Sequence, residues 1–148
     1  MNKFDIITTL QTQLGDAIVS VKRKSDLRIY IDITPHTLRD ASRMMLEEFG
    51  ARLQIATGVD TSKGLEVMYH WALDREGIVI TLRVLVDHDS PSLDSIAPMY
   101  PAAEWIEREI WELLGIQFKG HPDLRHLLLA DDWPEGSYPM RRNHGATT

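Results

Sequence analysis

The residues of this chain best suited to proton transfer are Glu107, Glu109 and His121. Carboxylates and imidazoles are the usual general acids and bases of enzymes, so one hypothesis is a stand-alone hydrolase or isomerase that uses them. The two glutamates lie on a predicted helix, where a separation of two residues places them about 160° apart around the axis. The pair therefore does not converge on one substrate. We expect no catalytic residue in this chain and keep the acid/base enzyme as an alternative.

Candidate metal ligands are His121, Asp123 and His126, which lie in a predicted loop. The separation of the two histidines differs from the i,i+4 spacing that places two ligands on one helix face, and ordinary loop hydrogen bonding is the simpler interpretation. The chain has no cysteine, so it lacks the thiolates of iron–sulfur clusters and of most structural zinc sites. It also has no glycine-rich nucleotide-binding motif and no nucleophile elbow. We expect no metal and no cofactor in this chain.

Length and composition favour a single globular domain. A chain of 148 residues with 43% hydrophobic content can bury one sizeable core. A formal net charge of −6 argues against nucleic acid, which requires a basic surface. The first ten residues resemble no cleavable signal, and no window approaches the ~20 apolar residues of a membrane span. We expect a soluble cytoplasmic protein that reaches a membrane only through a partner.

Hydrophobic periodicity and turn residues predict an α-β-β-α-β-β-β-α order of elements. Thr34 and Pro35 are typical of a helix start, and Gly15 and Gly50 of helix ends. The expected strands cover residues 17–23, 27–33, 52–59, 65–73 and 78–86, with a helical turn at 93–97 before the last helix. This order predicts a two-layer α+β domain, with helices on one face of a mixed, largely antiparallel sheet. The core domain is expected at residues 1–115.

The last helix has an apolar stripe and an opposite charged face. Glu104, Arg108 and Glu112 follow one another at four-residue spacing, and Trp105 and Trp111 flank them. Such ion pairs contribute only about 0.2–0.5 kcal/mol each, and exposed indoles are unfavourable. We therefore predict that a partner covers this face; plain surface decoration is the alternative. The buried stripe is expected to contain Ala103, Ile106, Ile110, Leu113 and Leu114.

Residues 116–148 are predicted to form an extended arm. Proline and glycine interrupt the segment repeatedly, yet it is too apolar for a disordered tail. Long structureless segments in compact domains are usually functional or disordered. We therefore expect this arm to lie on a partner and to become ordered there. Its large apolar residues are Phe118, Leu124, Leu127, Leu128, Leu129, Trp133, Tyr138 and Met140.

Several motifs in the last third of the chain occur in the order found in one known family. They are Ala103-Glu104-Trp105, Glu107-Arg108-Glu109, Gly115-Ile116, residues 120–125 (Gly-His-Pro-Asp-Leu-Arg) and residues 139–142 (Pro-Met-Arg-Arg). The chain resembles the 30-kilodalton subunit of respiratory complex I, the NADH:quinone oxidoreductase. Relatives of that subunit occur in membrane-bound, energy-converting nickel–iron hydrogenases. Trp111-Glu112 replaces the Tyr-Asp pair common in the respiratory subunits, and the chain stops soon after residue 142. Both features favour the hydrogenase type, or another ancestral ion-pumping relative, over a standard NADH-oxidising complex.

The resemblance implies a non-catalytic accessory subunit that buttresses a large hydrogenase-like subunit of the 49-kilodalton type. Iron–sulfur clusters, and a nickel–iron or quinone site, would then belong to partner subunits, and the chain would lie peripherally on the inner face of the cell membrane. A soluble adaptor unrelated to redox chemistry is a further alternative. The residues expected to bind partners are Trp105, Arg108, Glu109, Trp111, Glu112, Phe118, His121, Asp123, Arg125, Trp133, Arg141 and Arg142.

Overall fold

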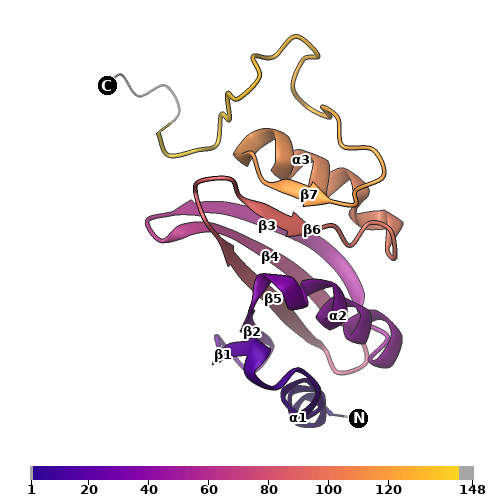
Figure 1. Cartoon of the computed structure of the whole chain (residues 1–148). Coiled ribbons are helices and arrows are strands. Elements are labelled where there is room, and N and C mark those ends of the chain that lie inside the picture. The colour runs from indigo at the N-terminus through magenta and orange to yellow at the C-terminus, as the bar shows by residue number, and fades with distance from the viewer. Residues whose placement is uncertain (1, 144–148) are drawn as a thin grey trace.

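A computed structural model describes residues 2–143, which form a curved five-stranded sheet, a two-stranded sheet and helices (Figure 1). The α-helices are α1 (Lys3–Leu14), α2 (Leu38–Arg43) and α3 (Glu104–Leu114). The strands are β1 (Ile18–Arg23), β2 (Arg28–Ile33), β3 (Arg52–Thr61), β4 (Gly64–Leu73), β5 (Ile78–Val86), β6 (Ser92–Asp94) and β7 (Gln117–Lys119). None of the helices within these residues is long and apolar enough to cross a membrane.

Helix α1 begins at a capping box. The Asn2 side chain accepts hydrogen bonds from the amides of Phe4 and Asp5, and the Asp5 carboxylate accepts one from the Asn2 amide. These contacts satisfy backbone donors that the first helical turn leaves free. Ile6 and Leu10 then point into the core, so the cap fixes where the helix starts and which face it buries.

Five strands form the main sheet in the order β1-β2-β5-β4-β3. Only the β2–β5 pair is parallel, and the other neighbours are antiparallel. Alternate residues of β2, β4 and β5 enter one hydrophobic cluster together with residues of all three α-helices. Tyr69 of β4 reaches α3 through this core, and Gly58 of β3 lies under Leu114 and Ile110. The sequence-based prediction of a two-layer α+β fold is therefore confirmed.

Two local predictions differ from the structure. The helix expected after Pro35 is divided into a 3₁₀ turn (Pro35–Thr37), α2 and a π-helical turn (Met44–Glu48). The helical turn expected at 93–97 is wrong, because Ser92–Asp94 forms β6 and pairs in parallel with β7. This pairing joins segments on either side of α3, so a short sequence window does not reveal it. Ile116 and Phe118 are buried, and the core therefore continues past residue 115, where the arm was expected to begin.

Candidate partner-binding surface

Glu107 is a buried carboxylate that connects α3 to the sheet. Its oxygens accept hydrogen bonds from the Tyr69 hydroxyl at 2.7 Å, the Ser95 hydroxyl at 2.5 Å and the Ile96 amide at 3.1 Å. Burial raises the pKa of Glu107 above its ordinary value, although these donors act in the opposite direction. The carboxylate is fully buried and has internal partners for both oxygens. The arrangement is that of a structural contact between three elements.

Arg108 and Glu112, which were expected on a charged face covered by a partner, do not face outward in the structure. Arg108 is 5% exposed, and its guanidinium donates to the carbonyls of Arg125 and His126. Glu112 is 2% exposed. The polar pattern predicted correctly that something covers this face of α3. The covering segment is the chain's own C-terminal part.

The Glu112 carboxylate lies in a row of backbone amides. It accepts hydrogen bonds from the amides of Leu127, Leu128 and Leu129 at 3.0, 2.7 and 3.2 Å, and one from His126 Nδ1 at 3.1 Å. Successive amides that point to one spot form a strong anion site. Burial opposes ionisation, but these donors outweigh it and lower the pKa of Glu112. Glu112 therefore fixes the path of the backbone across α3.

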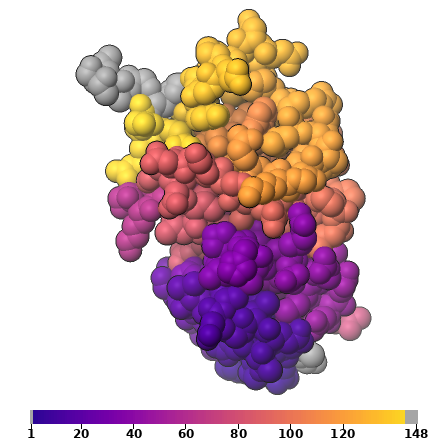
Figure 2. Space-filling model, viewed as in Figure 1, coloured from indigo at the N-terminus to yellow at the C-terminus, as the bar shows by residue number. Residues whose placement is uncertain are grey.

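We call residues 120–143 the strap, because they pass over α3 at the end of the molecule away from the N-terminus (Figures 1 and 2). The far part of the strap is also attached to the domain. The Met140 amide donates to the Leu113 carbonyl, and the Arg142 amide donates to the Asp60 carboxylate at 2.8 Å. The arm was expected to become ordered mainly on a partner, whereas in the structure these residues bind to the chain's own domain. Residues 144–148 of the predicted arm lie outside the described part.

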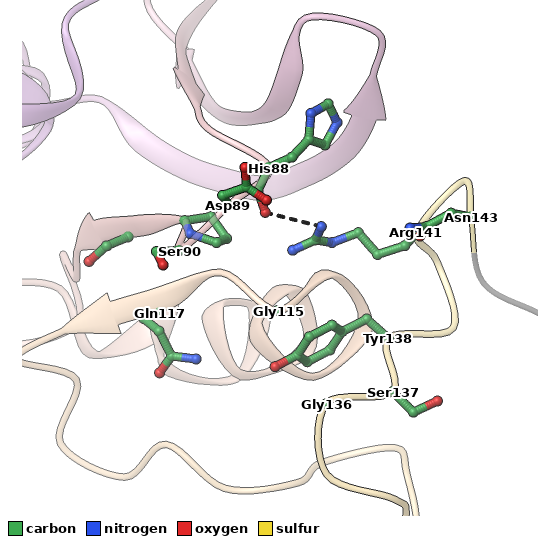
Figure 3. A pocket seen from close by; sticks show the side chains of 12 residues that line it. His88, Asp89, Ser90, Gly115, Gln117, Gly136, Ser137, Tyr138, Arg141 and Asn143 are labelled. Atoms are coloured by element: carbon green, nitrogen blue, oxygen red, sulfur yellow. Dashed lines mark hydrogen bonds between the residues drawn. The ribbon is translucent and has the colours of Figure 1, made fainter. Parts of the chain in front are cut away.

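An open polar pocket lies where the strap meets the β5–β6 loop and the end of α3 (Figure 3). Arg141 extends across it, donating to the carbonyls of Leu114 and His88. The ring of Tyr138 lies against Gly115, whose φ of 81° is the left-handed conformation that ends α3. The pocket is therefore the junction at which the end of the strap is anchored.

The twelve residues predicted to bind partners divide into outward and inward groups. Trp105 is 70% exposed, and Asp123, Arg125 and Arg142 are also exposed. Half-exposed members make local contacts: Trp111 stacks on His126, the Trp133 indole donates to the Ser137 carbonyl, and His121 donates to the Glu104 carbonyl. Glu109 and Arg141 are also half-exposed, whereas Arg108, Glu112 and Phe118 are buried.

The same end of the molecule carries exposed apolar residues outside these twelve, of which Leu128 and Met140 were expected only as part of the arm. Leu128 and Met140 on the strap are largely exposed, as is Ile55 on β3. Ile55 lines a groove with Trp105, Ile106 and Leu127. The run of three consecutive leucines in the strap is the sequence signal that could have identified Leu128. Ile55 was not identifiable in this way, because a bulge between Leu53 and Ile55 interrupts the alternation of inward and outward side chains along β3.

Comparisons with known proteins agree with this architecture. Residues 31–148 match the family described as respiratory-chain NADH dehydrogenase, 30 Kd subunit. Hydrogenase-4 component G of Escherichia coli (strain K12) is 34% identical over 143 residues, which cover 93% of this chain but only 26% of that protein. A subunit of the F(420)H(2) dehydrogenase of Methanosarcina mazei is 33% identical over 153 residues, which cover 97% of this chain and 92% of that one.

A solved structure shares the fold. A chain of the membrane-bound sulfane sulfur reductase, described as an archaeal respiratory membrane complex, superposes with a TM-score of 0.82. The superposition covers 97% of this chain and 85% of that chain, at 23% sequence identity. At this level of identity the likeness establishes the fold.

Proposed function

The chain belongs to the 30-kilodalton subunit family of respiratory-chain NADH dehydrogenase, and we propose that it is a non-catalytic accessory subunit of a membrane-anchored electron-transfer complex. Its role is to buttress a large hydrogenase-like subunit. The complex is of the NADH:quinone oxidoreductase type or the energy-converting hydrogenase type. Relatives of this chain include a hydrogenase-4 component and a subunit of an F(420)H(2) dehydrogenase, which supports this class of complex.

The size of the relatives supports a large partner. This chain corresponds to about a quarter of the Escherichia coli hydrogenase-4 component but to most of the Methanosarcina protein. The same domain therefore occurs both joined to much more polypeptide and as a short chain. We infer that the additional polypeptide of the longer relative is equivalent to a separate large subunit, and that the short chain docks on this subunit.

One observation carries the assignment to a binding role: the exposed Trp105 on α3. Arg108 and Glu112 of α3 are bound to the strap, whereas the Trp105 indole remains at the surface beside Leu127 and Ile106. Exposed tryptophans next to apolar residues are typical hot spots of protein interfaces. Arg125 and Leu128 extend this surface along the strap.

We place the electron-transfer cofactors in the partners. The sequence has no cysteine, so iron–sulfur clusters are assigned to the small subunits of the complex, and a nickel–iron or quinone site to the large subunit. The chain is then peripheral, on the cytoplasmic face of the membrane, and is held there by the complex.

Co-expression with the large hydrogenase-like subunit of the same complex tests this function. We expect the two to co-purify, and Trp105→Ala to lower the yield of complex by about tenfold, as removal of an interface tryptophan often does. Phe4→Ala is the matched control, because Phe4 is 55% exposed but lies on α1, at the other end of the molecule (Figure 2). Failure of the wild-type chain to bind the large subunit would contradict the proposal. It would favour the alternative that the chain is an adaptor unrelated to redox chemistry.

A further inference from the structure

In the described part of the chain, strand β3 has one edge without a neighbouring strand. It pairs with β4 along its whole length and is the last strand of the five-stranded sheet. Within residues 2–143, no backbone hydrogen bond reaches its outer edge. The edge of a strand presents N–H and C=O groups that a further strand can use. At ten residues, β3 offers several such groups in a row.

The two edges of the sheet differ in how they are protected. The opposite edge, β1, has six residues, ends in Lys22 and Arg23, and has a bulge between Ile18 and Ser20. Short length, positive charge and bulges are the usual means by which proteins prevent pairing at an edge. β3 begins with Arg52 and has a bulge between Leu53 and Ile55, but it contains no lysine and no proline, and from Ile55 to Thr61 its register with β4 is regular. This regular run is longer than the whole of β1 and lacks its pair of basic residues, which indicates that something covers it.

An apolar groove runs beside this edge. Leu53 and Ile55 of β3 form one wall, and Trp105 and Ile106 of α3 form the other. Ile55 is 52% exposed. Peptides that add a strand to a sheet gain affinity from main-chain hydrogen bonds, and specificity from pockets that take alternate side chains. β3 and its groove provide both features next to each other.

We propose that the free edge of β3 accepts an extended segment of the large partner subunit as an added strand, with an apolar side chain of that segment in the groove beside Trp105. This inference rests on the proposed function and specifies where and how the partner binds. Glu109 also lines the groove, and the chain carries a net charge of −6. A segment with lysine or arginine beside its apolar residue therefore fits better than a second copy of this acidic chain.

Hydrogen exchange on the full chain, alone and in complex with the large subunit, tests the proposal. Amides at alternate positions within residues 53–60 should exchange at least about tenfold more slowly in the complex. The amides of β1 are the control, because they lie on the opposite edge and should not change. A complex that forms without new protection in 53–60 overturns the added strand and leaves the proposed function intact. Absence of a complex contradicts the proposed function itself.

Two substitutions separate the groove from general surface effects. Ile55→Lys should lower the yield of complex by about tenfold, because it places a long charged side chain in the groove wall. Val19→Lys on β1 is the matched control, since Val19 is 68% exposed, and should leave the yield unchanged. Equal yields for both variants overturn the proposal. Sedimentation of the chain alone tests which molecule binds the edge of β3. A dimer in which residues 53–60 are protected would mean that a second copy of the chain, and not a segment of the partner, is added to β3, and would overturn the proposal.

Discussion

Arg108 and Glu112, one turn apart on α3, bind opposite polar groups of the same stretch of strap. Arg108 donates to the carbonyls of residues 125 and 126, and Glu112 accepts from the amides of residues 127–129. The strap crosses α3 at residues 125–129. Two neighbouring side chains of α3 thus bind the carbonyl groups at the start of this stretch and the amide groups at its end. The pair joins a helix of the domain to the segment expected to be an independent arm.

The first prediction concerns Arg108→Glu. Arg108 is buried against the strap, and the substitution removes its two hydrogen bonds and places a carboxylate against the carbonyls. We expect the free energy of unfolding to fall by about 3 kcal/mol or more, as when one partner of a buried charged contact is lost. Thermal melting of the isolated chain measures this. Arg125→Glu is the control and should melt near wild type, because that side chain is largely exposed. A nearly unchanged melt of Arg108→Glu would contradict the buried contact.

The second prediction concerns the dependence of strap stability on pH. The pKa of Glu112 is lowered in the folded chain from its ordinary value near 4.5. The carboxylate therefore contributes stability that is fully present above that value and is lost as the pH falls through the lowered pKa. Glu112→Gln should melt earlier than wild type at neutral pH, and this difference should shrink in acid. Melts across the acidic range measure both; a constant difference would mean that the charge of Glu112 is not what holds the amides.

The third prediction concerns protection of the strap in the isolated chain. The amides of Leu127, Leu128 and Leu129 are bound to Glu112, so we expect them to exchange more slowly than those of residues 130–132, which have no comparable anchor among the described contacts. In Glu112→Gln the three amides should lose most of this protection. Equal exchange along residues 127–132 in the wild-type chain would indicate that the strap is held elsewhere.

The main sheet was predictable from the sequence, and the strap contacts were not. Residues such as Leu65, Val67 and Tyr69 alternate along their strand, and alternation directly reports a face that is buried. The contact between Arg108 and the Arg125 carbonyl joins residues 17 positions apart through a backbone group. Every residue has such a group, so nothing in the side-chain pattern identifies the partner.

The same i,i+4 spacing had two interpretations at the candidate site. Arg108 and Glu112 are separated as in a surface ion pair, and also as in two residues that bind a third segment. Only the position of the strap distinguishes these cases. Trp105 was identifiable because its place on the helical wheel lies away from the buried stripe, and its exposure confirms that expectation. The free edge of β3 depends on strand order, which a short sequence pattern does not encode.

The fourth prediction concerns Glu107, whose behaviour with pH is opposite to that of Glu112. Burial raises its pKa above the ordinary value of 4.5, so at pH values between the ordinary and the raised pKa the folded chain holds a proton that the unfolded chain has released. The stability that comes from this group is therefore present at low pH and is lost as the pH rises through the raised pKa. Glu107→Gln removes the titrating carboxyl group. The free energy of unfolding of this variant should therefore no longer decline as the pH rises through the raised pKa of Glu107. Denaturant unfolding at a series of pH values measures this; parallel curves for the two proteins would contradict it.

The last prediction concerns Gly115 and Tyr138, which anchor the end of the strap. Gly115 has a φ of 81°, and a Cβ atom there would lie 2.5 Å from the Tyr138 ring. Gly115→Ala therefore adds backbone strain of roughly 1–2 kcal/mol and displaces the ring. We expect lower stability, and faster exchange of amides in residues 138–142. In the double variant with Tyr138→Ala the collision is absent, so its loss of stability should be smaller than the sum of the two single losses. Additive losses in denaturant unfolding would mean that the ring moves aside freely and does not hold the strap against the end of α3.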